Sequence, residues 1–342
     1  MNTPRPVSTH SITRRIVLVA GLIGLSGASC SSCDGGGGKG GGGSSGGGGW
    51  LVGTKGMMVN VTMDDPPSVI GYKLALAEDL RGIACRGDTE AWVVGNAGVL
   101  IATDDGGDTW RAFDSGVKST LRAVSLATDS HVFIAGDEGV LRFSRNRGAD
   151  WTTVQAPPVS WTSIAARRSD GAAALLTTAD GHIYHLDALG GLLSQVGAIP
   201  AGALHSVVMS RDGAVAVAVG DGGNLLVSTN GGIDWRTRAS GTDQALRDVW
   251  LIGGGASVMA VGDHGLVIEA SLTTDAAAVV RTLGDDLTFR GIHLEASGHG
   301  TIVGDRGTAF VSHDFGKTWQ SVATGETRDI LGVDALQVGG HF

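Results

Sequence analysis

Short apolar runs alternate with polar, glycine-containing turns along most of the chain. In residues 121–156 the runs LRAVSLA, HVFIAG, VLRFS and WTTVQA are separated by the turns TDS, DEG and RNRGAD. Apolar runs of this length predict β-strands, and short glycine-containing turns between them predict hairpins. No segment shows a long helical period, so we expect an all-β domain.

This strand pattern repeats seven times with a nearly constant period. A motif related to VGDxG closes the second run of each repeat, and its last glycines lie 41 or 42 residues apart. They are Gly56, Gly98, Gly139, Gly181, Gly223, Gly265 and Gly307. Four short strands repeated about every 42 residues are typical of the blades of a propeller.

Seven leaders of the form LRxV occur along the chain and indicate how the ring closes. The leaders begin at Leu80, Leu121, Trp161, Leu204, Leu246, Phe289 and Ile330. The first unit starts at Trp50 without a leader, and no blade follows the last leader. We therefore predict a seven-bladed β-propeller with four-stranded blades, in which the C-terminal strand completes the first blade and closes the ring.

Four turns repeat one eight-residue pattern. They are TDDGGDTW (103–110), SRNRGADW (144–151), STNGGIDW (228–235) and SHDFGKTW (312–319). A short Asp or Asn side chain can bond the backbone of its own turn, and the Trp supplies a large apolar surface between blades. Asn stands at the acid position twice, at Asn146 and Asn230, so we interpret the turn as a hairpin fastener and not as a catalytic site.

These turns resemble the Asp-box, or bacterial neuraminidase repeat. The resemblance raises a sialidase hypothesis, which would require a tyrosine nucleophile, an acid Asp and an arginine triad. The two tyrosines, Tyr72 and Tyr184, lie in degenerate units, and no Arg-Ile-Pro motif is present. Glycosidase activity is therefore the least favoured alternative.

With their VGDxG motifs and LRxV leaders, the units of residues 50–342 resemble the photosystem II stability/assembly factor family of seven-bladed propellers. The resemblance implies a non-enzymatic protein that binds a partner membrane protein, with an arginine patch on one face involved in binding. We expect an unidentified envelope or membrane protein as the partner here.

The second residues of the leaders are the candidate partner-binding site. In the four-strand order the leader is innermost, so these residues and the VGDxG turns share one face of the ring. The candidates are Arg81, Arg122, His205, Arg247 and Arg290. Arginine suits a carboxylate-rich or phosphate-bearing partner. The alternative is local ion pairing with the acids of the turns, Asp137, Asp221, Asp263 and Asp305.

A carbohydrate or surface-polymer binder is the other functional alternative. Exposed aromatic side chains on the ring face would favour it, and Trp92, Trp161 and Trp250 are the candidates. The sequence has no glycine-rich phosphate loop, nucleophile elbow or metal-ligand spacing. We expect no catalytic residue, no cofactor and no metal.

The first 49 residues predict export and tethering. Residues 1–30 have Arg14 and Arg15 before a short apolar core, the pattern of a secretory signal. Small residues before Cys30 resemble a bacterial lipoprotein signal with Cys30 lipidated, although ordinary cleavage nearby is an alternative. Residues 31–49 are a Gly/Ser-rich flexible tether, and 50–342 form the propeller. We expect an exported envelope protein held to the membrane only through its lipid.

Charge and cysteine content narrow the range of partners. Removing the signal with its three arginines changes the net charge from −9 to −12. An acidic domain of this kind is a poor nucleic-acid binder. Cys85 lies in an apolar strand-like run and is expected to be a buried small hydrophobe. We expect a monomer.

Overall fold

The computed structural model describes residues 14–15, 48–64, 66–87, 89–128, 130–171, 173–187, 193–196 and 202–336. Apart from β1 (Arg14–Arg15), the predicted signal and Cys30 lie outside these residues, as does the tether up to residue 47. None of the helical segments in the described part of the chain has the length and hydrophobicity needed to cross a membrane.

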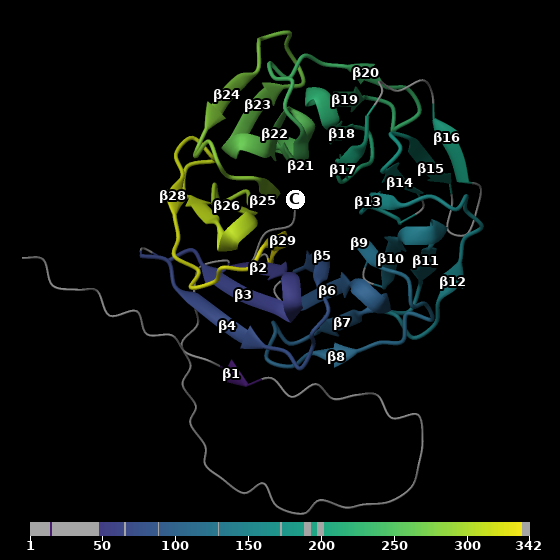
Figure 1. Ribbon diagram of the computed structural model, residues 1–342. Helices are drawn as coiled ribbons and strands as arrows, with labels where there is room; N and C mark the ends of the chain where they lie inside the picture. The colour runs from purple at the N-terminus through teal and green to yellow at the C-terminus, as the bar shows by residue number, and fades with distance from the viewer. Residues whose placement is uncertain are drawn as a thin grey trace, which may run out of the picture.

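Seven antiparallel sheets stand around a central axis, as Figure 1 shows. Blade 2 contains β5 (Leu80–Arg86), β6 (Glu90–Gly95), β7 (Leu100–Thr103) and β8 (Arg111–Ala112). Blade 3 contains β9 (Leu121–Ala127), β10 (His131–Gly136), β11 (Leu141–Ser144) and β12 (Thr152–Thr153). Blade 4 contains β13 (Trp161–Ala166), β14 (Ala173–Thr178), β15 (Ile183–Asp187) and β16 (Leu193–Val196).

The remaining complete repeats follow the same order from the axis outward. Blade 5 contains β17 (Leu204–Met209), β18 (Ala216–Gly220), β19 (Leu225–Ser228) and β20 (Arg236–Thr237). Blade 6 contains β21 (Leu246–Ile252), β22 (Ser257–Gly262), β23 (Leu266–Ser271) and β24 (Val279–Thr282). Blade 7 contains β25 (Phe289–Leu294), β26 (Gly300–Gly304), β27 (Ala309–Ser312) and β28 (Gln320–Ser321).

Blade 1 joins the two ends of the propeller, which confirms the predicted closure. The last strand, β29 (Ile330–Leu336), pairs antiparallel with β2 (Gly48–Gly53), which continues into β3 (Met57–Thr62) and β4 (Val69–Lys73). In Figure 1 the yellow β29 lies beside the purple β2, nearest the axis. The short β1 adds to the outer edge of β4 in parallel. The predicted all-β, seven-bladed fold with four-stranded blades is thus confirmed.

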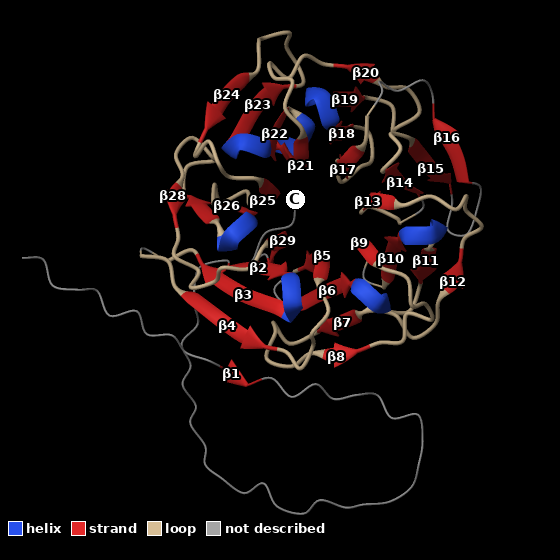
Figure 2. Cartoon of the chain, viewed as in Figure 1, coloured by secondary structure: helices blue, strands red, loops and turns tan. Residues whose placement is uncertain are grey.

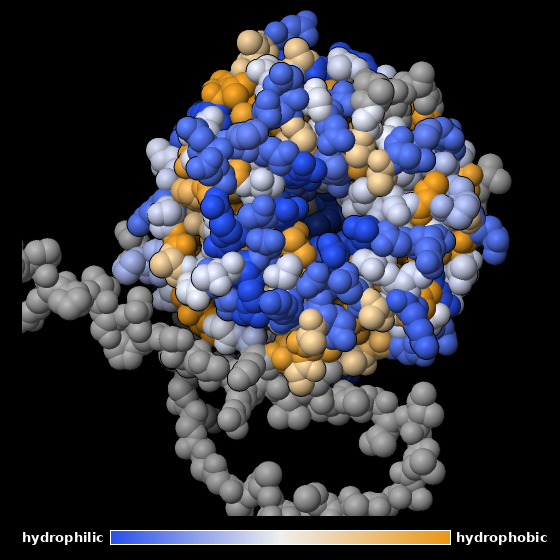
Figure 3. Space-filling view, viewed as in Figure 1, coloured by the Kyte–Doolittle hydropathy of each residue, from blue (hydrophilic) through white to orange (hydrophobic). Residues whose placement is uncertain are grey.

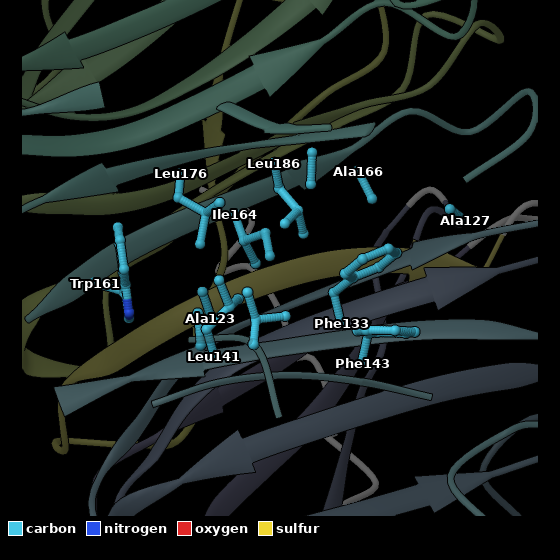
Figure 4. Packing of buried hydrophobic residues seen from close by; sticks show 13 residues of the cluster. Ala123, Ala127, Phe133, Leu141, Phe143, Trp161, Ile164, Ala166, Leu176 and Leu186 are labelled. Carbon is cyan, nitrogen blue, oxygen red and sulfur yellow. The ribbon is translucent and has the colours of Figure 1, made fainter. Parts of the chain in front are cut away.

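The core lies between neighbouring blades. The first residue of every inner strand is fully buried, and the second strands of blades 2, 4, 5 and 7 are buried along their whole length, because both faces of each sheet are covered by adjacent sheets. Figure 4 shows one such layer, in which Trp161, Ile164 and Leu176 of blade 4 pack against Phe133 and Leu141 of blade 3. Each such side chain contributes about 1.5–3 kcal/mol of burial free energy.

The eight-residue turns fasten the outer hairpins, as predicted. In the last of them, the Ser312 hydroxyl donates to Asp314, and the backbone N–H and hydroxyl of Thr318 donate to the two oxygens of Asp314 at 2.8 and 2.6 Å. The tryptophans of the turns pack between blades, so that Trp110 meets Trp50 of blade 1 with ring centroids 5.4 Å apart. A Cβ on Gly107 would lie 2.3 Å from the Trp50 ring, so glycine is required there.

Outer strand length follows the presence of this turn. The four blades that carry it end in two-residue strands, whereas the outer strands of blades 1, 4 and 6 have four or five residues. The turn therefore replaces most of the outer strand's hydrogen bonding with bonds from its own side chains.

Candidate functional site

One end of the ring gathers all seven second residues of the inner strands. They line a single cavity of about 180 Å³ at the opening of the central channel. The seven are Arg81, Arg122, Thr162, His205, Arg247, Arg290 and Leu331. We call this end the mouth face, and Figure 3 shows strongly hydrophilic residues around a central hollow. The five predicted site residues are therefore brought together.

A β-bulge in every inner strand positions these side chains. Leu80 pairs with Gly95 and Gly82 with Val94, which leaves Arg81 as an extra residue opposite no partner. The same register shift occurs in the other six inner strands. A bulge redirects a side chain away from the normal alternation, so the second residue is directed to the mouth while the first residue stays in the core.

Short 3-10 turns follow the second strands on this face, and four of the six carry the acids Asp137, Asp221, Asp263 and Asp305. The turns concerned are η1 (Thr54–Gly56), η2 (Asn96–Gly98), η3 (Asp137–Gly139), η4 (Asp221–Gly223), η6 (Asp263–Gly265) and η7 (Asp305–Gly307). Figure 2 shows the helical turns, in blue, outside the innermost strands. The bulge residues and the 3-10 turns share one face because each turn begins at the level of the neighbouring bulge.

Three arginines form two-pronged ion pairs with the acid of their own blade. Arg122 donates to Asp137 at 2.6 and 3.0 Å, and Arg247 donates to Asp263 at 2.9 and 2.7 Å. Arg290 binds Asp305 in the same manner through Nε and Nη2. The predicted local ion pairing therefore exists at these three positions.

The other two candidates depart from this pattern. In η2 an asparagine replaces the acid, and Arg81 donates to Asn96 at 2.8 Å and to Asp79 at 3.3 Å. The Nε2 atom of His205 lies 2.7 Å from Asp221 and 3.0 Å from Nη1 of Arg247, which links blades 5 and 6.

The ion pairs lower the pKa of two of the paired acids, Asp137 and Asp263. The Arg247 bonds lower the pKa of Asp263, and at Asp137 the Arg122 bonds outweigh a desolvation that by itself raises the pKa. About a third of each arginine side chain remains exposed, and pairs exposed to this degree contribute about 0–1 kcal/mol each. Their main effect is to fix the direction of the guanidinium groups.

Deeper in the channel lie polar residues that the sequence interpretation missed. Asp248, the third residue of β21, accepts bonds from the Ser206 hydroxyl at 2.7 Å and the Ile292 N–H at 2.9 Å. It thereby joins blades 5, 6 and 7. Desolvation deep in the ring raises the pKa of Asp248 to about 6, although part of the residue still borders the channel.

Asp334 makes the corresponding link across the closure. It accepts the Cys85 N–H at 2.7 Å and lies 2.7 Å from Nδ1 of His293, so it joins blades 7, 1 and 2. Burial alone would raise the pKa of Asp334, but the His293 ring and the Cys85 bond outweigh it, and the pKa is lowered. Trp250 packs on the His293 ring at 4.3 Å between centroids.

A comparison of the seven leaders could have identified both acids. The third leader position is Gly, Ala or Ser in six repeats and Asp248 in one; the fifth holds an acid only at Asp334. Both carboxylates accept bonds from adjacent inner strands, whose edges are not paired with each other. The two acids therefore act as links between blades.

Two of the proposed carbohydrate-facing aromatics lie in the core. Trp92 is 2% exposed and Trp161 is fully buried, and Trp250 is partly covered by His293. Cys85 is buried, as predicted, and burial raises the pKa of its thiol. In the ranges that the structure describes, no group of three or more His, Cys, Asp or Glu side chains is arranged to hold a metal ion.

Comparisons with known proteins give one family match and several structural matches. The family model of "Photosynthesis system II assembly factor YCF48" matches residues 68–329. No curated protein matches the sequence. A solved structure of YCF48 bound to D1 peptide is 19% identical, with 71% of this chain and 80% of that chain covered and a TM-score of 0.57.

Two further solved structures have the same architecture. YCF48 from Cyanidioschyzon merolae is 18% identical, with 75% of this chain and 88% of that chain covered and a TM-score of 0.60. The WD40 β-propeller domain of Doa1 is 14% identical, with 75% and 86% covered and a TM-score of 0.62. At these identities the likeness is one of fold.

Proposed function

The chain belongs to the family of the photosynthesis system II assembly factor YCF48, and from this membership we propose that it is a non-enzymatic propeller that docks a partner protein on its mouth face. One observation carries the proposal: bulges in the seven inner strands bring Arg81, Arg122, His205, Arg247 and Arg290 around one cavity. A protein partner is also supported by the solved relative that is bound to a D1 peptide.

The geometry supports docking by a fixed array of donors. The paired acids hold each guanidinium in one direction, which reduces the side-chain entropy lost on binding. Arginine presents several N–H groups in a planar fork, so a group bound through Nε and Nη2 still has donors for a second carboxylate. The partner would therefore add acceptors to a surface that is already ordered.

The test is crosslinking and capture from membranes with the full chain. The variant carries Arg81→Ala, Arg122→Ala, Arg247→Ala and Arg290→Ala, and the control carries Arg111→Ala, Arg167→Ala, Arg211→Ala and Arg236→Ala, which removes the same charge away from the mouth. We expect one partner to be lost only in the first variant. An unchanged partner set with intact circular dichroism would contradict docking at the mouth face.

A parallel set of Arg→Gln changes, which retain hydrogen-bond donors toward the acids, covers the case in which alanine prevents folding.

We also propose that the protein is exported and held at the envelope membrane by a lipid on Cys30, with the glycine-rich residues 31–49 as the tether. The support is the sequence pattern before Cys30. In a detergent phase-partition experiment, the wild type is expected in the detergent phase and Cys30→Ser in the aqueous phase. Cys33→Ser is the matched control and should behave like the wild type. Equal partition of all three proteins would contradict lipidation at Cys30.

A further inference from the structure

The charges of the mouth face lie in two concentric zones, and we propose that they select a partner element with an acidic tip between basic flanks. The inference rests on the proposed docking function and specifies its ligand. The inner zone consists of the four mouth arginines. The outer zone, which we call the acidic collar, consists of Asp79, Asp137, Glu138, Asp221, Asp243, Asp263, Asp285, Asp286 and Asp305.

The cavity lining places the four arginines inside the acids of the collar, and the acid that lines the cavity itself is Asp248, deeper in the channel. Arg81, Arg122, Arg247 and Arg290 all line the mouth cavity, whereas none of the acids that bind them does. The arginines come from the innermost strands, and the acids come from the turns and loops farther from the axis. A ligand that enters along the axis therefore meets positive charge first at its tip.

Two of the arginines keep donors for such a tip. Arg122 and Arg290 bind their acids through Nε and Nη2, and within the described residues Nη1 of each has no partner. At Arg247 the corresponding Nη1 contacts His205. Carboxylates of a ligand at the mouth can thus accept from Nη1 of Arg122 and from Nη1 of Arg290 without displacing Asp137 or Asp305.

The collar extends beyond the paired acids. Asp243 precedes β21, and Asp285 and Asp286 precede β25, in loops that pack against the 3-10 turns of the mouth face. These three side chains are exposed and form no ion pair among the described residues, while Arg306 donates to the backbone carbonyl of Asp286 and the His264 ring lies 3.3 Å from that of Asp285. The bases Lys55, Lys118, Arg306 and Arg328 lie on the same turns and loops, but the nine acids outnumber them, so the collar is net negative.

This arrangement discriminates between ligands of different charge order. The mouth arginines attract the tip of a uniformly acidic segment, and the collar repels its flanks. For a uniformly basic segment, the arginines repel the tip and the collar attracts the flanks. Opposite charges in register favour association, whereas like charges brought together cost several kcal/mol. Salt does not fully screen charges that lie within about 8–10 Å of each other, so a bound segment responds to each zone separately. Only a segment with basic, acidic and basic sections satisfies both zones.

The experiment uses two labelled peptides of identical composition and fluorescence anisotropy at low ionic strength with the full chain. The first is Lys-Lys-Gly-Glu-Glu-Glu-Glu-Gly-Lys-Lys, and the second is Glu-Glu-Gly-Lys-Lys-Lys-Lys-Gly-Glu-Glu. We expect the first to bind about tenfold more tightly. Equal binding, a reversed preference, or no binding of either peptide overturns the inference.

Substitutions then assign each zone. Asp243→Asn, Asp285→Asn and Asp286→Asn together should weaken the first peptide about threefold to tenfold. A control with Asp104→Asn, Asp108→Asn and Asp187→Asn removes the same charge elsewhere and should have no effect. In the membrane capture experiment, a partner that is lost with the arginines but unaffected by the collar changes rejects the concentric arrangement and leaves the docking function standing.

Discussion

Single acidic side chains in the channel wall connect blades that are far apart in sequence. Asp334 reaches a backbone N–H 249 positions away, and Asp248 connects three consecutive blades. Inner strands of adjacent blades do not pair with one another, so their free N–H groups need acceptors. Ser125 and Ser163 serve the same purpose with hydroxyl groups, accepting from Ala166 and Val207. A carboxylate at such a position makes the connection dependent on pH.

We predict that Asp248→Asn stabilises the protein at alkaline pH. The folded pKa of Asp248 is raised to about 6 from 3.8, so its contribution favours folding below pH 3.8 and is lost as the pH rises through 6. Because one pKa unit corresponds to 1.36 kcal/mol, the loss in the free energy of unfolding is about 1–3 kcal/mol. Urea denaturation should show the variant more stable than the wild type at pH 8, with a smaller difference at pH 4. The exposed Asp187→Asn is the control, and parallel pH profiles for all three proteins would contradict the prediction.

At the scale of the element, the fastening turn exists in two chemical versions. In one, Asp105 or Asp314 accepts from a threonine hydroxyl four residues later. In the other, Asn146 and Asn230 donate to an aspartate at that later position, at 2.8 Å in both cases. The donor and acceptor have exchanged places while the bond across the turn is kept. The sequence alone indicated a structural turn and showed which turns combine Asn with Asp. The exchange of donor and acceptor became clear only from the hydrogen bonds across each turn.

We predict that the two versions are interchangeable. Asp314→Ala removes the acceptor for two Thr318 donors and should cost about 1–2 kcal/mol of the free energy of unfolding. The double variant Asp314→Asn with Thr318→Asp should recover most of that loss in chemical denaturation at pH 7. A double variant as unstable as Asp314→Ala would show that the turn depends on more than this bond.

The same turn predicts a sensitivity to acid. The hydroxyl and N–H bonds of Thr318 lower the pKa of Asp314 to about 2 from 3.8. The stabilisation by Asp314 is therefore present above pH 3.8 and is lost as the pH falls toward 2. Between pH 5 and pH 2.5, the difference in unfolding midpoint between the wild type and Asp314→Ala should shrink, and a constant difference would contradict this assignment.

At the scale of the whole molecule, the fold was predictable from the sequence and the contacts inside the channel were not. The 42-residue period, the LRxV leaders and the missing leader before Trp50 together predict seven blades and their closure, because each is a local pattern repeated along the chain. The contacts of Asp248 and Asp334 depend on which inner strands become neighbours around the axis. Those contacts arise from closure of the ring, so no single repeat contains the information.

We predict that the ring depends on its last strand. A chain that ends at residue 329 lacks β29, which exposes the β2 edge and removes Ile330 and Ala335 from the core together with the Asp334 link. Loss of a fully buried aliphatic side chain alone costs about 2–5 kcal/mol. The midpoint temperature of thermal unfolding and the resistance to protease should both be much lower than for a chain that ends at residue 336. Equal stability of the two chains would mean that closure contributes little.

The bulge in each inner strand also has an evolutionary consequence. Its extra residue makes no cross-strand pair in the ladder and lies outside the apolar core, so folding constrains the identity of that residue less than that of its neighbours. Within this one chain the position already holds arginine, threonine, histidine and leucine on the same backbone. Natural selection can therefore vary the seven residues around the mouth one at a time, as a combinatorial display, and a lineage can acquire a new binding specificity without first passing through an unstable intermediate.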